Sequence, residues 1–295
     1  FRPIRDLAEK YNILQNAMAS AERIFLILDS REVLPRPAVQ RANRASRLQR
    51  VEEIRFENVY FGYVDGENIL RNITFSISAG ETVAVVGPTG AGKTSLINLI
   101  PRFYDPASGQ VLINGLDLKD LNVSSFRSKI ALVMQDPFLF SGTIRQNIFQ
   151  DSRDPTAAQE QFIIAASNCR PLIDRLPRGL DTVLSEGGAS ISSGERQLIS
   201  IARAFARNPQ LILFDEATSY IDSTTELAIQ QAVETLMKNR TSLVVAHRLS
   251  TVRNAHRIIV LHRGRIIETG NHVELMKRKG FYHKLHQLQN GRDLE

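Results

Sequence analysis

A glycine-rich segment at residues 87–94, GPTGAGKT, constrains the fold of this 295-residue chain more than any other feature. It matches the pattern G-x-x-x-x-G-K-[ST], and it lies between an apolar run at 83–86 and a helical pattern, which is the context that this pattern requires. In such a loop the glycines let backbone N–H groups surround phosphates, Lys93 neutralises phosphate charge and Thr94 offers a hydroxyl to Mg²⁺. The segment therefore predicts an α/β fold with a phosphate site where a strand meets a helix.

Other apolar runs end in polar residues that would gather at the same edge of an open parallel sheet. Asp215 closes the run 211–214 and is placed to contact Mg²⁺, while Glu216 either polarises water for hydrolysis or only caps the next helix. His247 ends another such run, where a hydrogen-bond donor could reach a γ-phosphate, although a lone histidine is more often structural. Gln135 also follows a strand pattern, and by itself it is a weak signal.

Residues 192–195, SSGE, pose a question of their own. Ser192, Ser193 and Gly194 are typical of a helix start that leaves backbone N–H groups free for an anion. Glu195 places a carboxylate in the same turn, where it complements the helix dipole and would repel a phosphate. A helix is expected to follow, because apolar residues recur at helical spacing at Leu198, Ile201, Ala202 and Phe205. From the residues alone, its start is either a ligand site or only a well-capped helix end.

The chain is organised in blocks. Residues 3–29 predict a helix, residues 31–50 with their two prolines and frequent arginines predict a linker, and residues from 54 onward predict short β-strands followed by strands alternating with helices. Residues 257–270 predict a hairpin, and residues 271–289 predict one closing amphipathic helix.

Composition narrows the function classes. The net charge of +6 comes almost entirely from residues 1–50, where ten Lys/Arg face five acids, so the remaining residues are nearly neutral and do not indicate a nucleic-acid-binding domain. The basic segment at residues 1–50 fits an anionic lipid surface, DNA or merely a solvated arm.

Cys169 is the only cysteine, which favours a reducing compartment. No stretch is long and apolar enough for a membrane span, and because the sequence begins with Phe we expect a fragment.

The order of these candidate residues along the chain resembles that of the nucleotide-binding domain of ATP-binding cassette (ABC) exporters. The residues that carry the resemblance are Tyr63, the loop at 87–94, Gln135, residues 191–195, Asp215-Glu216, Asp222 and His247. The resemblance covers about residues 51–290, and residues 1–30 resemble the cytoplasmic end of the last transmembrane helix. It implies a RecA-like α/β core in residues 51–295, with an antiparallel β-subdomain at about 54–80 and a helical subdomain at about 137–207.

The resemblance also implies residue roles. Tyr63 would stack on adenine, Glu216 would be the general base, His247 would be the switch histidine, and Gln135 would couple Mg²⁺ and the attacking water to the transport domain. Asp222 would communicate across a dimer, and residues 182–188 resemble the loop that touches the membrane domain, although Ser185 stands where glycine is usual. ATP would be bound by Tyr63, Gly87, Pro88, Thr89, Gly90, Ala91, Gly92, Lys93, Thr94, Ser95, Ser192, Ser193, Gly194 and Glu195, and Mg²⁺ by Thr94, Gln135 and Asp215.

The resemblance answers the question of residues 191–195, ISSGE, which stand where the family has the signature Leu-Ser-Gly-Gly-Gln. That signature caps the ATP of the opposite subunit in a head-to-tail dimer. Ser193 adds bulk at a glycine position and Glu195 adds a negative charge. We therefore expect a heterodimer with unequal ATP sites, in which this chain holds the competent one; the alternative is a homodimer in which both changes are neutral.

Together these features predict an exporter ATPase at the cytoplasmic face of a membrane, joined to a transmembrane domain and not to nucleic acid. A non-transport ABC ATPase acting on nucleic acid or ribosomes is the alternative function, disfavoured because it would have no need of the N-terminal helix. A non-catalytic nucleotide sensor is disfavoured because Lys93, Asp215, Glu216 and His247 are all present.

Overall fold

The computed structural model describes residues 1–30, 48–64, 66–134, 136–150, 155–188, 190–215, 222–245 and 252–290. Its contacts divide the chain into two units, Phe1–Pro35 and Arg36–Glu295. The first unit contains the helix α1 (Arg2–Leu28), which begins with Pro3 in its first turn and buries none of its side chains. A proline suits the first turn because the N–H that it lacks has no partner there in any helix.

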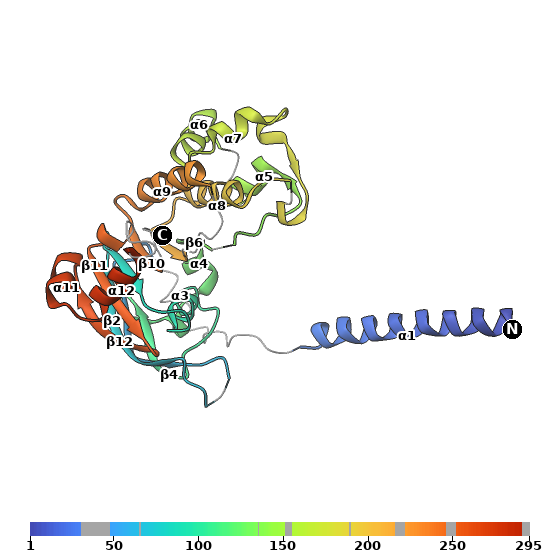
Figure 1. The fold of residues 1–295 in the computed structure, drawn as a ribbon, viewed down its shortest axis with the longest axis horizontal. Helices are drawn as coiled ribbons and strands as arrows, with labels where there is room; N and C mark the ends of the chain where they lie inside the picture. The colour runs from blue at the N-terminus through green and yellow to red at the C-terminus, as the bar shows by residue number, and fades with distance from the viewer. Residues whose placement is uncertain are drawn as a thin grey trace. The chain divides into compact units, whose positions relative to one another are not determined.

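A six-stranded sheet forms the centre of the second unit, in the order β12-β11-β3-β10-β9-β6. Figure 1 labels β6, β10, β11 and β12 of this sheet. The strands from β11 to β6 are parallel, and β12 pairs antiparallel with β11 at the edge. The central strand β3 therefore lies between two strands from the far end of the sequence. The strands are β3 (Thr82–Val86), β6 (Ile130–Val133), β9 (Leu211–Asp215), β10 (Thr241–Val245), β11 (Arg257–His262) and β12 (Arg265–Gly270).

An antiparallel sheet in the order β2-β1-β4-β5 covers one face of the parallel sheet. Because side chains alternate along a strand, β3 sends Val83 and Val85 into the core shared with this antiparallel sheet and sends Ala84 and Val86 into the core on the opposite face. The elements on this side are β1 (Glu53–Phe61), β2 (Leu70–Ser78), β4 (Ser108–Ile113), β5 (Leu116–Asp117), α3 (Lys93–Leu99), α4 (Val123–Arg127) and the 3₁₀ turn η1 (Leu118–Asp120).

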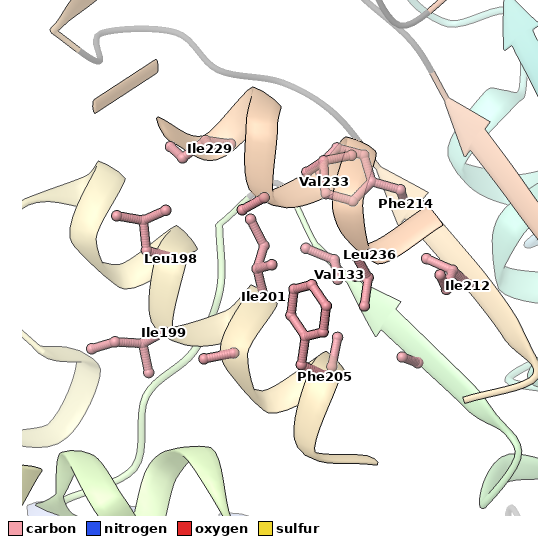
Figure 2. Close-up of a cluster of buried hydrophobic side chains, with 14 of the residues drawn as sticks. Val133, Leu198, Ile199, Ile201, Phe205, Ile212, Phe214, Ile229, Val233 and Leu236 are labelled. Atoms are coloured by element: carbon pink, nitrogen blue, oxygen red, sulfur yellow. The ribbon is translucent and has the colours of Figure 1, made fainter. Parts of the chain in front are cut away.

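Helices cover the other face. The apolar side of α8 packs against α9 and β6, with Ile201 and Phe205 of α8 facing Val233 and Leu236 of α9 (Figure 2). The elements here are α5 (Ile144–Ile148), α6 (Ala157–Ala166), α7 (Arg170–Arg175), α8 (Ser193–Arg207), α9 (Ser223–Met237), the strands β7 (Gly142–Thr143) and β8 (Val183–Leu184), and the 3₁₀ turns η2 (Gly179–Asp181) and η3 (Glu186–Gly188).

The structure confirms the hairpin predicted at 257–270 but not the single closing helix predicted at 271–289. Two helices are present instead, α11 (His272–Arg278) and α12 (Phe281–Asn290). The break occurs because Lys279 ends α11 in the left-handed conformation (φ 51°) and Gly280 follows. The Glu268 carboxylate then accepts hydrogen bonds from the backbone N–H groups of Phe281 and Tyr282 at the start of α12. The amphipathic pattern continues across the break, so periodicity alone could not reveal it.

Candidate nucleotide site

The glycine-rich loop joins the end of β3 to the start of α3. Gly92 is the residue before the helix and has a left-handed backbone (φ 102°), and Gly87 is also at positive φ (157°). A Cβ atom on Gly87 would lie 2.1 Å from the carbonyl oxygen of Leu261 in β11. The loop therefore needs glycine because its backbone lies directly against the neighbouring strand.

Lys93 lies within this loop rather than in solvent. Its Nζ donates hydrogen bonds to the carbonyl oxygens of Gly87 (2.8 Å) and Pro88 (3.0 Å), and the residue is 6% exposed. Burial lowers the pKa of Lys93, and the carboxylate of Asp215 partly opposes this shift. An ammonium group held against the backbone of the phosphate loop in this way is suited to neutralise a phosphate.

Thr94 and Asp215 meet although they are far apart in the sequence. Thr94 is in the first turn of α3 and Asp215 ends β9, and the Thr94 hydroxyl donates to the Asp215 Oδ2 atom at 3.1 Å. A hydroxyl and a carboxylate are oxygen ligands of the type that Mg²⁺ takes beside phosphates. The residues present therefore fit a magnesium ion next to the phosphate loop.

Tyr63 lies beside the same helix. It follows β1 by two residues and is 48% exposed. Its hydroxyl group accepts long hydrogen bonds from Ser95 Oγ (3.3 Å) and Asn98 Nδ2 (3.4 Å), both on α3. An exposed aromatic ring next to the phosphate loop can stack on a nucleotide base. Sequence reasoning missed Asn98, although it is three residues after Ser95 and therefore on the same helix face.

The turn between β11 and β12 braces the phosphate loop, although no motif in the sequence indicates this role. The backbone N–H of Gly264 donates to the carbonyl oxygen of Ala91 (3.1 Å), and the Gly264 carbonyl accepts from the N–H of Arg71 in β2 (2.7 Å). A Cβ atom on Gly264 would lie 1.9 Å from the carbonyl oxygen of Ile69. Both sheets therefore hold this loop through one glycine.

Residues 192–195 form the start of α8. The Ser192 hydroxyl accepts a hydrogen bond from the N–H of Glu195 (3.2 Å), and Glu195 Oε2 accepts one from the N–H of Ser192 (2.9 Å), so the two residues form a reciprocal capping box. The other oxygen of Glu195 pairs with Arg175 of α7 at 2.5 Å. Ser192 and Ser193 are exposed. Within the described residues, no hydrogen bond joins this segment to the phosphate loop.

Asp222 caps α9. Its carboxylate accepts hydrogen bonds from the hydroxyl of Thr224 (2.5 Å) and the N–H of Thr225 (2.9 Å), and these bonds lower the pKa of Asp222 to about 2. Ser185 lies between β8 and η3, and its carbonyl accepts from the N–H of Gly188. Three predicted site residues, Gln135, Glu216 and His247, lie outside the described residues.

In the part of the chain that the structure describes, no helix is both long and apolar enough to span a bilayer. The same residues contain no group of three or more His, Cys, Asp or Glu side chains arranged to hold a metal ion. The oxygen pair of Thr94 and Asp215 is a different kind of site, because it contains one hydroxyl and one carboxylate.

Comparisons with known proteins agree with this geometry. The family model described as ABC transporter matches residues 70–219. The chain is 44% identical over 288 residues to an uncharacterized ABC transporter ATP-binding protein, YfiC, of Bacillus subtilis (98% of this chain, 47% of the relative). It is 46% identical over 290 residues to an ATP-dependent lipid A-core flippase of Syntrophus aciditrophicus (98% and 47%).

Among solved structures, a bacterial Atm1-family ABC exporter with ATP bound is similar, with a TM-score of 0.78 and 36% identity. The match covers 94% of this chain and 48% of that one. The chain thus spans about half the length of the curated relatives that it matches.

Proposed function

Because this chain belongs to the ABC transporter family, whose ATP-binding domains are ATPases coupled to transport, we propose that it binds and hydrolyses ATP to drive export across a membrane. One contact carries this assignment: Thr94, next to the phosphate-loop lysine, donates to Asp215 at the end of β9 at 3.1 Å. A structural strand–helix turn has no need of a carboxylate at that place, whereas a Mg²⁺–nucleotide site requires one.

We assign roles to the residues accordingly. Residues 87–95 surround the phosphates, Lys93 neutralises their charge, and Tyr63 stacks on adenine. Thr94, Asp215 and Gln135 would hold Mg²⁺, which when bound neutralises charge on the phosphates. Glu216 accepts the proton of the attacking water as general base, and His247 donates to the γ-phosphate.

The domain would act as one half of a head-to-tail pair. Ser192, Ser193, Gly194 and Glu195 would cap the ATP of a second nucleotide-binding domain, and the exposure of Ser192 and Ser193 at the start of α8 supports this. Ser193 adds bulk where the family has glycine. We therefore propose that the partner is a different subunit with an intact signature, so that this chain's own site is the competent one and its signature faces a weaker site.

The whole protein would be anchored in a membrane with this domain at the cytoplasmic face. Residues 1–30 would continue the last transmembrane helix, residues 31–50 would be a linker, and residues 51–295 would form the nucleotide-binding domain. Two relatives carry names that fit this assembly, the lipid A-core flippase and a fatty acid ABC transporter ATP-binding/permease protein of Mycobacterium bovis. The alternative, an ATPase that acts on nucleic acid, is not favoured because the excess of positive charge lies in residues 1–50 and not on the domain.

The test uses the full-length protein with its partner subunit, and compares Glu216→Gln with Glu52→Gln, an exposed glutamate outside the site. Glu216→Gln should retain ATP binding and lose hydrolysis by about 10²–10⁴-fold, because an amide cannot accept the proton of water. Glu52→Gln should leave both unchanged. Near-normal turnover by Glu216→Gln would contradict the assignment of the general base.

A further inference from the structure

The ring of Tyr63 is fixed at several points although half of it is exposed. Phe61 and Tyr104 each contact it edge-on, with ring centroids 5.0 Å away and ring planes at 81°. Contacts of this geometry between aromatic rings are favourable. An exposed side chain without such partners changes rotamer on the picosecond to nanosecond timescale. The two rings therefore restrict the sideways movement of Tyr63.

The hydroxyl end of Tyr63 is fixed by α3. Ser95 Oγ and Asn98 Nδ2 both donate to it, at 3.3 and 3.4 Å. Ser95 is buried and Asn98 is half-buried, so neither side chain can move away freely. Because α3 begins at Lys93, one and the same helix carries the end of the phosphate loop and the partners of the tyrosine hydroxyl.

From these contacts we infer that Asn98 is a positioning residue, which with Tyr104 holds the Tyr63 ring at a set distance from the phosphate loop before nucleotide arrives. This inference rests on the proposed stacking of Tyr63 on adenine. A ring that is already held in place loses less conformational freedom when the base binds, and this raises affinity for the base without changing affinity for the phosphates.

The expected consequence is specific to the base. Removing the amide with Asn98→Ala should raise the KM for ATP by about 2–10-fold, which is the effect of immobilising one side chain. It should leave kcat near its wild-type value, because among the described residues the Asn98 amide donates to Tyr63 and not to Lys93, Thr94 or Asp215.

The experiment measures ATPase kinetics of the full-length protein with its partner, together with the inhibition constant of inorganic tripolyphosphate as a competitor. Tripolyphosphate has the phosphates of ATP but no base. Asn98→Ala and Tyr63→Phe should each raise the KM for ATP and leave the inhibition constant of tripolyphosphate unchanged. The double variant should resemble Tyr63→Phe, because Tyr63→Phe already removes the hydroxyl group that accepts from both Ser95 and Asn98.

An equal loss of ATP and tripolyphosphate affinity in Asn98→Ala would overturn the inference, because Asn98 would then only support α3. An unchanged KM for ATP would overturn it as well. The KM for ATP of Tyr63→Ala shows whether the positioning role of Asn98 is wrong or whether Tyr63 does not bind the base at all. If Tyr63→Ala raises the KM for ATP while Asn98→Ala does not, the base site stands and the positioning role is wrong; if neither does, the base lies elsewhere.

Discussion

Both carboxylate oxygens of Glu195 are engaged within the subunit, one by the Arg175 guanidinium at 2.5 Å and the other by the N–H of Ser192. Sequence reasoning expects this carboxylate to repel a polyphosphate. In the structure its charge has an immediate counterion, and Glu195 itself is largely buried while Arg175 is exposed. The electrostatic effect of the acidic residue at the start of α8 therefore depends on Arg175.

We predict that Arg175→Ala impairs the ATP site that this chain would cap in the proposed head-to-tail pair, because it leaves the Glu195 charge uncompensated. The expected loss of ATP affinity at that site is about 2–10-fold, or about 0.4–1.4 kcal/mol for a charge in high-dielectric surroundings. Stability should fall by less than about 1 kcal/mol, as is usual for exposed ion pairs. Adding Glu195→Gln should restore affinity, and a loss that persists in this double variant would contradict the explanation.

Restoring the signature tests the heterodimer directly. The full-length chain is expressed alone, and its ATPase activity is compared with that of Ser193→Gly/Glu195→Gln. We expect low activity for the wild type and higher activity for the variant, because each ATP in a homodimer would be capped by the altered signature. Robust wild-type turnover that the variant does not improve would favour a homodimer instead.

Gly264→Ala should destabilise the domain far more than the same substitution at another glycine with positive φ. Its Cβ would collide with the carbonyl of Ile69 at 1.9 Å, whereas Gly115, at a similar φ, has nothing within 4 Å. We expect Gly115→Ala to cost about 1–2 kcal/mol from its backbone conformation, and Gly264→Ala about 2–5 kcal/mol from conformation and collision together. Chemical denaturation measures both, and equal losses would contradict the bracing role of Gly264.

The histidines at the C-terminal helices predict a loss of stability in acid. His272 Nδ1 lies 2.8 Å from the Tyr282 hydroxyl, and the His286 ring is 5.5 Å from the His272 ring. Burial lowers the pKa of His272, and the charges of His286 and Arg253 lower it further. Burial also lowers the pKa of His286, where the charges of Arg253 and His283 add to the effect.

The unfolded chain therefore binds protons more readily at these two residues than the folded one. Their contribution to stability is complete above the ordinary histidine pKa of about 6.5 and is lost as the pH falls through the lowered values. The melting temperature should drop between pH 7.5 and 5.5, and His272→Gln/His286→Gln should reduce this drop. An identical pH dependence in the variant would assign the acid sensitivity to other groups.

The phosphate loop and the strands beside it are predictable from sequence because each combines a local pattern with a fixed context. The loop at 87–94 follows β3, and Asp215 closes β9, as expected. The surroundings of Glu195 are not predictable in this way, because Arg175 comes from another helix and its approach depends on packing. The contacts between Tyr63 and Tyr104 are equally non-local. The roles of Gln135, Glu216 and His247 stay predictions, since these residues lie outside the described ones.

The position of β3 in the sheet has a consequence for synthesis of the protein on the ribosome. Both strands that flank β3, β10 and β11, are made only after residues 87–240. At about 5–20 residues per second, the ribosome needs about 8–30 s to make that stretch. During this interval the strand that leads into the phosphate loop has two unpaired edges, which are open to association with other chains. Both neighbours of β3 are present only once β11, which ends at His262, has been translated, so the edges of this strand stay unpaired for as long as residues 87–240 emerge.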